Sequence, residues 1–128
     1  MSGPPVIEDA VAIVPVRDLA ETIAFYRDVL GFEPQLVTED GSFGTVVRGS
    51  AAIHFTTTQD PDALRATAMN LSLHVWVRNL DRLYDELRPN LESLPEDWVR
   101  PPFDQPYGVR EFHGKDPDGC LLLFAESD

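Results

Sequence analysis

One short phrase occurs twice in the chain, and this internal repeat is the feature that most constrains the fold. The stretch VPVRDL at 14–19 returns as VWVRNL at 75–80, offset by 61 residues, with Val, Val, Arg and Leu in matching places. A chain of 128 residues has room for one domain of ordinary size. A repeat inside so short a chain predicts one small module, duplicated in tandem.

The residues around each copy predict the same order of elements. A β-rich run precedes each copy, DAVAIVPV in the first and LSLHVWV in the second. Helix signals follow, because Asp18 and Asn79 are natural N-caps and Glu21 completes a capping-box pattern. Apolar residues then recur at helical spacing: Leu19, Ile23, Tyr26 and Leu30, and later Leu80, Leu83 and Leu87. We expect Gly31 to end the first helix and Arg88-Pro89 to end, or nearly end, the second.

Three strand candidates follow each helix. In the first half they cover roughly 32–38, 43–48 and 51–57, with turns at Asp40-Gly41 and Gly49-Ser50. In the second half they cover roughly 97–102, 109–115 and 120–126, and DPDG at 116–119 forms the last turn. The stretch 58–70 is expected to be a joining loop with one helical turn. Each half is therefore βαβββ, in a single α+β domain over 1–128 with modules at about 8–58 and 70–128.

Composition limits the classes of function. No run of about 18 apolar residues occurs, so no membrane-spanning helix is expected. The start MSGPPVIED lacks the order of a secretory signal, and the lone Cys120 cannot form an internal disulfide, so we expect a cytoplasmic protein. A net charge of −12 repels phosphate backbones and argues against nucleic acid as a partner. Whether this charge serves solubility or attracts a cationic ligand is left open by the sequence.

Two phrases at the ends of the modules carry a family resemblance. The stretches VRDLAETIAFYRDVLGF and GVREFHGKDPDGCLLLF, set in paired βαβββ modules, resemble the vicinal oxygen chelate superfamily of glyoxalase I, extradiol dioxygenases and bleomycin resistance proteins. FGTVVRG, VWVRNLDRLYDEL and DQPYGVREF look most like the bleomycin resistance proteins. The resemblance implies cup-shaped mixed sheets that enclose one site.

The resemblance also implies where a metal ion would be bound. Enzymes of this superfamily place ligands at four strand positions, which hold Val11, His54, Ser72 and Leu123 in this chain. Valine and leucine have no donor atom, and serine is a poor ligand for the usual divalent ions. We therefore expect a metal-free protein without a cofactor. An unconventional site built from His54, His74 and His113 remains the alternative.

Strand alternation predicts which side chains line the cup. If Ser72 faces inward, so do His74 and Trp76. Reading the DPDG turn as a three-residue hairpin with a glycine bulge pairs His113 with Leu123 and Glu111 with Ala125, which points Glu111 and His113 inward. Phe43 and Tyr107 match aromatic wall positions of the resistance proteins. The candidate ligand-binding residues are Phe43, His54, Ser72, His74, Trp76, Tyr107, Glu111 and His113.

The role of Glu111 has three readings on this register. It would act as a general base if the cup desolvates it. Alternatively it forms an ion pair with Arg110 or Arg48, or it meets a cation of the ligand.

We expect a binding protein that sequesters a cationic or aromatic compound, such as a bleomycin-type antibiotic, without changing it, and that confers antibiotic resistance. No catalytic residue is assigned. The alternatives are a lyase, isomerase or dioxygenase acting on a small metabolite, and a housekeeping metabolite-binding protein.

The resemblance further implies a homodimer whose ligand sites lie between the subunits. In the resistance proteins an N-terminal arm crosses to the partner, and SGPPVIEDAV occupies that place here. Pro4 and Pro5 lack amide donors and favour an extended path, which suits a crossing segment.

Overall fold

The two predicted modules are present, one after the other in the chain. A computed structural model describes residues 3–128. The first module comprises β1 (Ile13–Val16), α1 (Leu19–Asp28), β2 (Glu33–Val37), β3 (Phe43–Arg48) and β4 (Ala51–Thr57). The second comprises β5 (Ser72–Trp76), α3 (Leu80–Leu91), η1 (Glu96–Trp98), β6 (Val99–Gln105), β7 (Val109–Lys115) and β8 (Leu121–Ser127). The prediction of tandem βαβββ units in the α+β class is confirmed.

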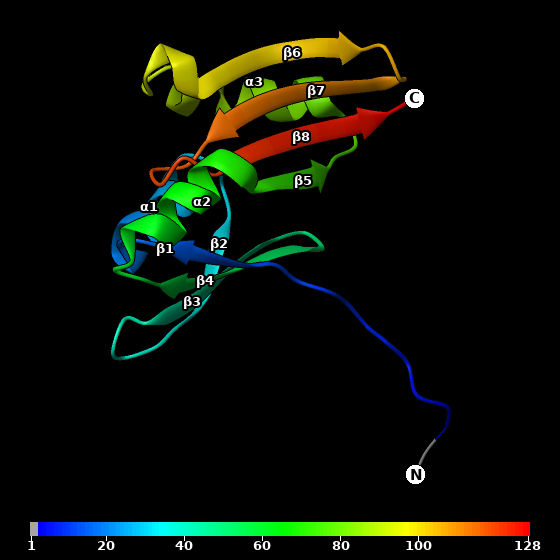
Figure 1. The fold of residues 1–128 in the computed structure, drawn as a ribbon. Coiled ribbons are helices and arrows are strands. Elements are labelled where there is room, and N and C mark those ends of the chain that lie inside the picture. Colours follow the sequence, from blue (N-terminus) through cyan, green and yellow to red (C-terminus); the bar gives the residue numbers. More distant parts are fainter. Residues whose placement is uncertain (1–2) are drawn as a thin grey trace.

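Each module forms a four-stranded mixed sheet with the same topology. The strand orders are β1-β4-β3-β2 and β5-β8-β7-β6, and in each sheet the first strand lies parallel to the last one. The remaining neighbours are antiparallel, as their short connections require. Figure 1 shows the second sheet above the first, with α1 and α2 at one side and the N-terminal segment extending away from both sheets.

A single hydrophobic core joins the modules. Tyr26 of α1 is fully buried and packs against Phe55 of the first sheet, with ring centroids 4.9 Å apart. In the second sheet Phe112 and Phe124 stack with centroids 4.7 Å apart beneath α3. This core also contacts Leu73, Val75 and Val77, as strand alternation requires if Ser72, His74 and Trp76 face the cup. One face of each sheet is thereby covered by its helix, and the other face is left for a site.

The two crossover helices begin differently, although the sequence predicted the same cap for both. The Asp18 carboxylate accepts a hydrogen bond from the Glu21 amide (3.1 Å), as expected, but the Glu21 carboxylate pairs with Arg17 (2.9 Å) and does not close a capping box. Asn79 makes no side-chain cap and has a φ of 62°. The Glu126 carboxylate accepts instead from the amides of Asn79 (2.9 Å) and Leu80 (3.0 Å). A strand side chain distant in sequence thus caps α3, which a local pattern does not reveal.

The two crossover helices end at or close to the predicted positions. Gly31 has a φ of 74°, and the Phe32 amide donates to the Tyr26 carbonyl (2.9 Å), so glycine closes the end of α1 as predicted. The second helix continues for two residues beyond Pro89, to Leu91, which agrees with the prediction that Arg88-Pro89 ends, or nearly ends, this helix. Leu91 is buried in the core, and its burial favours these two additional helical residues despite the missing amide hydrogen of Pro89.

Two further elements differ from the sequence prediction. The stretch expected to be a loop contains the ten-residue helix α2 (Pro61–Asn70), whose N-cap Asp60 accepts from the Asp62 amide (3.0 Å) with proline in the first turn. The strand expected at 97–102 begins at Val99 and continues to Gln105, after a short 3-10 turn. No helix within residues 3–128 is long and apolar enough to cross a membrane.

Candidate functional site

The uncovered face of the second sheet brings most of the predicted site residues together. The register pairs His113 with Leu123 and Glu111 with Ala125, which confirms the predicted hairpin. His74 lies beside Leu123, and Trp76 beside Ala125, on the adjacent strand β5. Since neighbouring partners share a face, His74, Trp76, Glu111 and His113 lie on the face opposite α3. We call this surface the second-sheet face.

A buried carboxylate lies at the centre of the second-sheet face. Glu111 is only 1% exposed, and its oxygens accept from Tyr107 Oη (2.9 Å), Gln105 Nε2 (3.3 Å) and His113 Nε2 (2.7 Å). Burial raises the pKa of Glu111, but the hydrogen bonds from His113, Tyr107 and Gln105 outweigh it and hold this pKa below its ordinary value. Glu111 therefore remains an anion, and the predicted pairing with Arg110 or Arg48 was wrong. Arg110 binds Asp81 and Asp104, while Arg48 binds Glu86.

Aromatic rings surround this carboxylate and remain accessible. Trp76 is 61% exposed and its ring lies 5.3 Å from that of His74, at an interplanar angle of 30°. Phe103 packs edge-on against His113 with centroids 5.2 Å apart. Tyr107 is 66% exposed, although its hydroxyl is held by Glu111. Exposed rings beside a buried anion form a surface suited to a flat ligand that carries a positive charge or hydrogen-bond donors.

Arg100 and Phe103 also belong to this surface, and the sequence did not predict their place in it. The Arg100 guanidinium lies 3.5 Å from the centroid of the Phe103 ring. The two side chains share a face, although they are three residues apart, because the register of β6 against β7 shifts between them. Pro101 and Pro102 lie at this shift and have no amide hydrogen to donate to the neighbouring strand. These two prolines are the sequence feature from which the shift could have been predicted.

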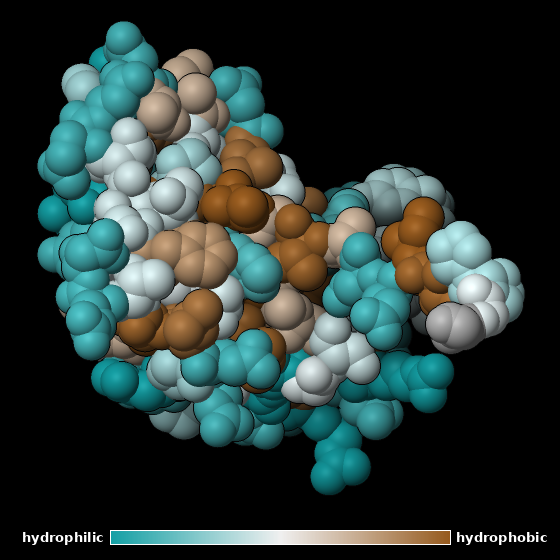
Figure 2. All heavy atoms as spheres, turned by 90° about the horizontal axis from the view of Figure 1, so that it is seen from below, coloured by the Kyte–Doolittle hydropathy of each residue, from teal (hydrophilic) through white to brown (hydrophobic). Residues whose placement is uncertain are grey.

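The uncovered face of the first sheet carries a smaller aromatic group. Phe43 packs edge-on against His54, with centroids 5.6 Å apart, from the neighbouring strands β3 and β4. Ile13, Leu36 and Val37 are more than half exposed on this module. Figure 2 shows the molecule from below. Hydrophobic side chains gather near the middle of the surface seen in that view and are bordered by hydrophilic ones. Phe43 and His54 thus lie together, on a different sheet from the second-sheet face.

A match to a protein-family model identifies the family of this chain. The model described as Glyoxalase/Bleomycin resistance protein/Dioxygenase superfamily matches residues 9–124, which include both modules. The chain belongs to this superfamily. The resemblance read from the repeat and the end phrases is confirmed.

Several relatives and solved structures that match this chain are named for bleomycin. The bleomycin resistance proteins of Geobacillus stearothermophilus and of Staphylococcus aureus are each 27% identical, covering 90% of this chain and 93% of theirs. Among solved structures, the bleomycin-binding protein from Streptomyces verticillus complexed with copper(II)-bleomycin is 25% identical with a TM-score of 0.78, covering 98% of this chain and 100% of that one. The bleomycin resistance determinant of transposon Tn5 shares the fold with a TM-score of 0.76, at 24% identity and 95% and 99% coverage.

The positions that the superfamily resemblance assigned to metal ligands are spread over both sheets. His54 lies on β4 and Leu123 on β8, Ser72 begins β5, and Val11 precedes β1. Within residues 3–128 no group of three or more His, Cys, Asp or Glu side chains is arranged to hold a metal ion. His54, on the first sheet, does not join His74 and His113 in such a group within one chain.

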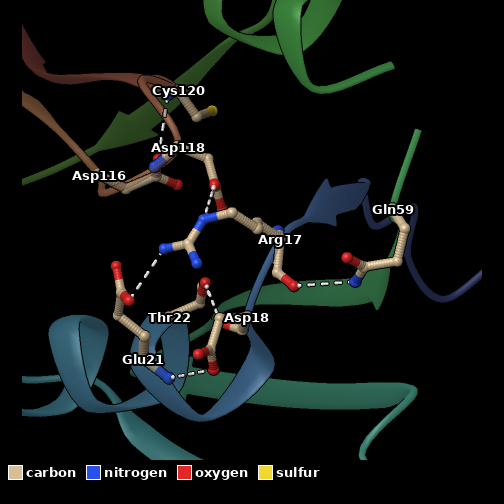
Figure 3. Close-up of polar contacts among 8 residues, drawn as sticks. All are labelled: Arg17, Asp18, Glu21, Thr22, Gln59, Asp116, Asp118 and Cys120. Carbon is tan, nitrogen blue, oxygen red and sulfur yellow. Dashed lines mark hydrogen bonds and ion pairs between the residues drawn. The ribbon is translucent and has the colours of Figure 1, made fainter. Parts of the chain in front are cut away.

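A second polar cluster lies where the modules meet and is not part of the second-sheet face (Figure 3). The Asp116 carboxylate is buried and accepts from Tyr26 Oη (3.0 Å) and from the amides of Asp118 and Cys120 (both 3.0 Å). Burial raises the pKa of Asp116 to about 6, because these hydrogen bonds only partly offset the loss of water. Burial, together with the charge of Asp116, also raises the pKa of the Cys120 thiol to about 12, so the thiol is unreactive.

Proposed function

We propose that this protein binds a flat aromatic or cationic compound of the bleomycin type on the second-sheet face and sequesters it unchanged. The observation that carries the proposal is the exposure of Trp76 and Tyr107 around the anionic Glu111. Ring faces supply contact area at low conformational cost, and a buried anion favours a ligand with positive charge. Glu111 already accepts three hydrogen bonds, so it is better placed to orient a ligand than to accept a proton.

The proposed site is completed by a second copy of the chain. The second-sheet face and the Phe43–His54 pair lie on different sheets, so we infer that the first sheet of one subunit faces the second sheet of its partner in a homodimer. The N-terminal segment supports this arrangement, since it leaves the fold in an extended path and exposes Val6 (77%) and Ile7 (94%). Exposed apolar side chains on such a segment are typical of an interaction surface.

The proposal makes the protein a cytoplasmic, metal-free antibiotic-binding protein that confers resistance by sequestration. In this account His54, Ser72, His74 and His113 contact the ligand together with the aromatic residues. A preorganised cleft suffices for sequestration, because no bond of the ligand has to be broken.

Calorimetric titration with metal-free bleomycin tests the proposal. We expect saturable binding to the wild-type protein and about 5- to 150-fold weaker binding to Trp76→Ala, because loss of a stacked ring costs about 1–3 kcal/mol. Tyr107→Phe keeps the ring but removes the hydroxyl that holds Glu111, and should weaken binding less. Met69→Ala changes an exposed apolar residue on α2 and serves as the matched control. Absence of binding, or equal affinity of Trp76→Ala and Met69→Ala, would refute the assignment.

A further inference from the structure

The internal repeat places an arginine at the start of each crossover helix, and the two arginines have different surroundings. Arg17 is neutralised at the end of the first module (Figure 3). Its guanidinium contacts the Glu21 carboxylate (2.9 Å) and lies 4.0 Å from the Asp118 carboxylate, and its amide donates to Asp118 (3.2 Å). The side chain of Gln59 also donates to the Arg17 carbonyl (3.4 Å). Carboxylates and the connecting segment therefore occupy this end of the molecule.

The corresponding end of the second module lacks these carboxylates. At the repeat offset of 61 residues Arg78 replaces Arg17, and Arg82 stands where the first module has Glu21. The nearby turn between β3 and β4 is Gly49-Ser50, without an acidic residue. In the part of the chain that the structure describes, Arg78 and Arg82 form neither an ion pair nor a side-chain hydrogen bond. Glu126 lies near Arg78, but its carboxylate is held by the amides of Asn79 and Leu80. Neither guanidinium group therefore has an ion-pair partner within residues 3–128, in a chain whose net charge is −12.

Arg78 and Arg82 line a groove of about 920 Å³ between the two modules. Its apolar lining includes Leu30, Phe32, Val75, Trp76, Val77, Leu83 and Phe124. Arg48 and Glu86 also border the groove, but they neutralise each other (2.7 Å), and Arg48 donates to the Leu30 carbonyl (3.2 Å). Asp85 is the remaining acidic residue of the lining, so the two free arginines outnumber it. We call this space the Arg78 groove.

We propose that the Arg78 groove binds a small amphipathic anion, with a carboxylate, sulfonate or phosphate group on an aromatic or branched aliphatic body. A guanidinium presents its donors in a planar fork that matches such oxyanions, and the apolar lining accommodates the body. The volume lies within the range of small-molecule sites. Val75, Val77 and Phe124 line the groove from the helix-covered side of the second sheet, and Trp76 of the second-sheet face also borders it. Because Arg78 and Arg82 do not belong to the second-sheet face, the proposal for the groove does not depend on the proposed function.

The test uses the full chain, naphthalene-2-carboxylate as the probe, and the neutral naphthalene-2-carboxamide as its matched analogue. Titration calorimetry should show saturable binding of the carboxylate that Arg78→Ala/Arg82→Ala weakens at least tenfold, while affinity for the carboxamide changes less than twofold. Arg27→Ala/Arg65→Ala alters the net charge equally at exposed positions outside the groove and should leave both affinities unchanged.

A second variant keeps the test decisive if the double alanine variant folds poorly. Arg82→Glu recreates the spacing of Arg17 and Glu21 within the second module, so it should keep the fold and still abolish carboxylate binding. The proposal is wrong if the wild-type chain does not bind the carboxylate, or if the arginine variants bind it as well as the wild type. The proposal is also wrong if only the variant Glu8→Gln/Asp9→Asn binds the carboxylate. That result would mean that the acidic N-terminal segment of a chain occupies the Arg78 groove in the wild-type protein.

Discussion

Glu111 and Asp116 are buried carboxylates five residues apart in the sequence, and their pKa values shift in opposite directions. Glu111 receives three hydrogen bonds from side chains, one of them from a histidine, and stays ionised. Asp116 also receives three hydrogen bonds, but none from a basic group, so they only partly offset the loss of water and its pKa rises. Glu111 is therefore a buried anion on the second-sheet face, whereas Asp116 links the second module to Tyr26 of the first.

Asp116→Asn is predicted to remove a pH dependence of stability. Because the folded-state pKa is raised from 3.8 to about 6, this group contributes stability that is fully present below about pH 4 and is lost as the pH rises through 6. Two pKa units correspond to roughly 3 kcal/mol. The amide can keep the hydrogen bonds, since the Tyr26 hydroxyl accepts as well as donates. Relative to the wild type, the variant should therefore gain up to about 3 kcal/mol between pH 4 and pH 7.5.

Urea unfolding at several pH values checks this prediction, with Asp28→Asn as the control. Arg27 lowers the pKa of the exposed Asp28, so that substitution should change the relative stability in the opposite direction with pH. A stability difference between the wild type and Asp116→Asn that does not vary with pH would contradict the account of Asp116.

At the scale of elements, the strands and the first helix could be predicted because their signals are local. Alternation with glycine and proline turns located β3, β4 and β7 at their observed bounds, and Asp18 and Gly31 marked the two ends of α1. Helix α2 was missed because its buried surface is small, with Thr67 its one buried side chain, so no apolar stripe forms. The cap of α3 was misassigned because Glu126 is 46 residues away from Leu80.

The start of α3 depends on a backbone conformation that most residues adopt at a cost. Asn79 has a φ of 62°, a region in which asparagine and glycine are tolerated, while a β-branched residue is strained. We predict that Asn79→Val lowers the free energy of unfolding by about 1–2 kcal/mol, whereas Asn79→Gly changes it by less than about 0.5 kcal/mol. Chemical denaturation measures both, and equal losses in the two variants would contradict a conformational role for this residue.

At the scale of the whole molecule, the repeat produces two sheets with similar topology but different uncovered faces. The second-sheet face has a buried anion and exposed rings, while the first sheet offers Phe43 and His54. Sequence alternation predicted that Glu111 and His113 share a face, and the register confirms it. It could not place Arg100 and Phe103, because a register shift reverses the alternation at Pro101 and Pro102. It also could not reveal that Glu111 binds Tyr107 and Gln105 across the hairpin.

The proposed binding protein is a homodimer with two ligand sites, each shared by both subunits, and it leaves the ligand unchanged. Native mass spectrometry of the full chain with excess bleomycin measures assembly, stoichiometry and ligand mass together. We predict a species of twice the 14.3 kDa chain mass that carries two ligands, each released with its original mass. A monomer that carries one ligand would contradict the shared site, and a released ligand of altered mass would contradict sequestration.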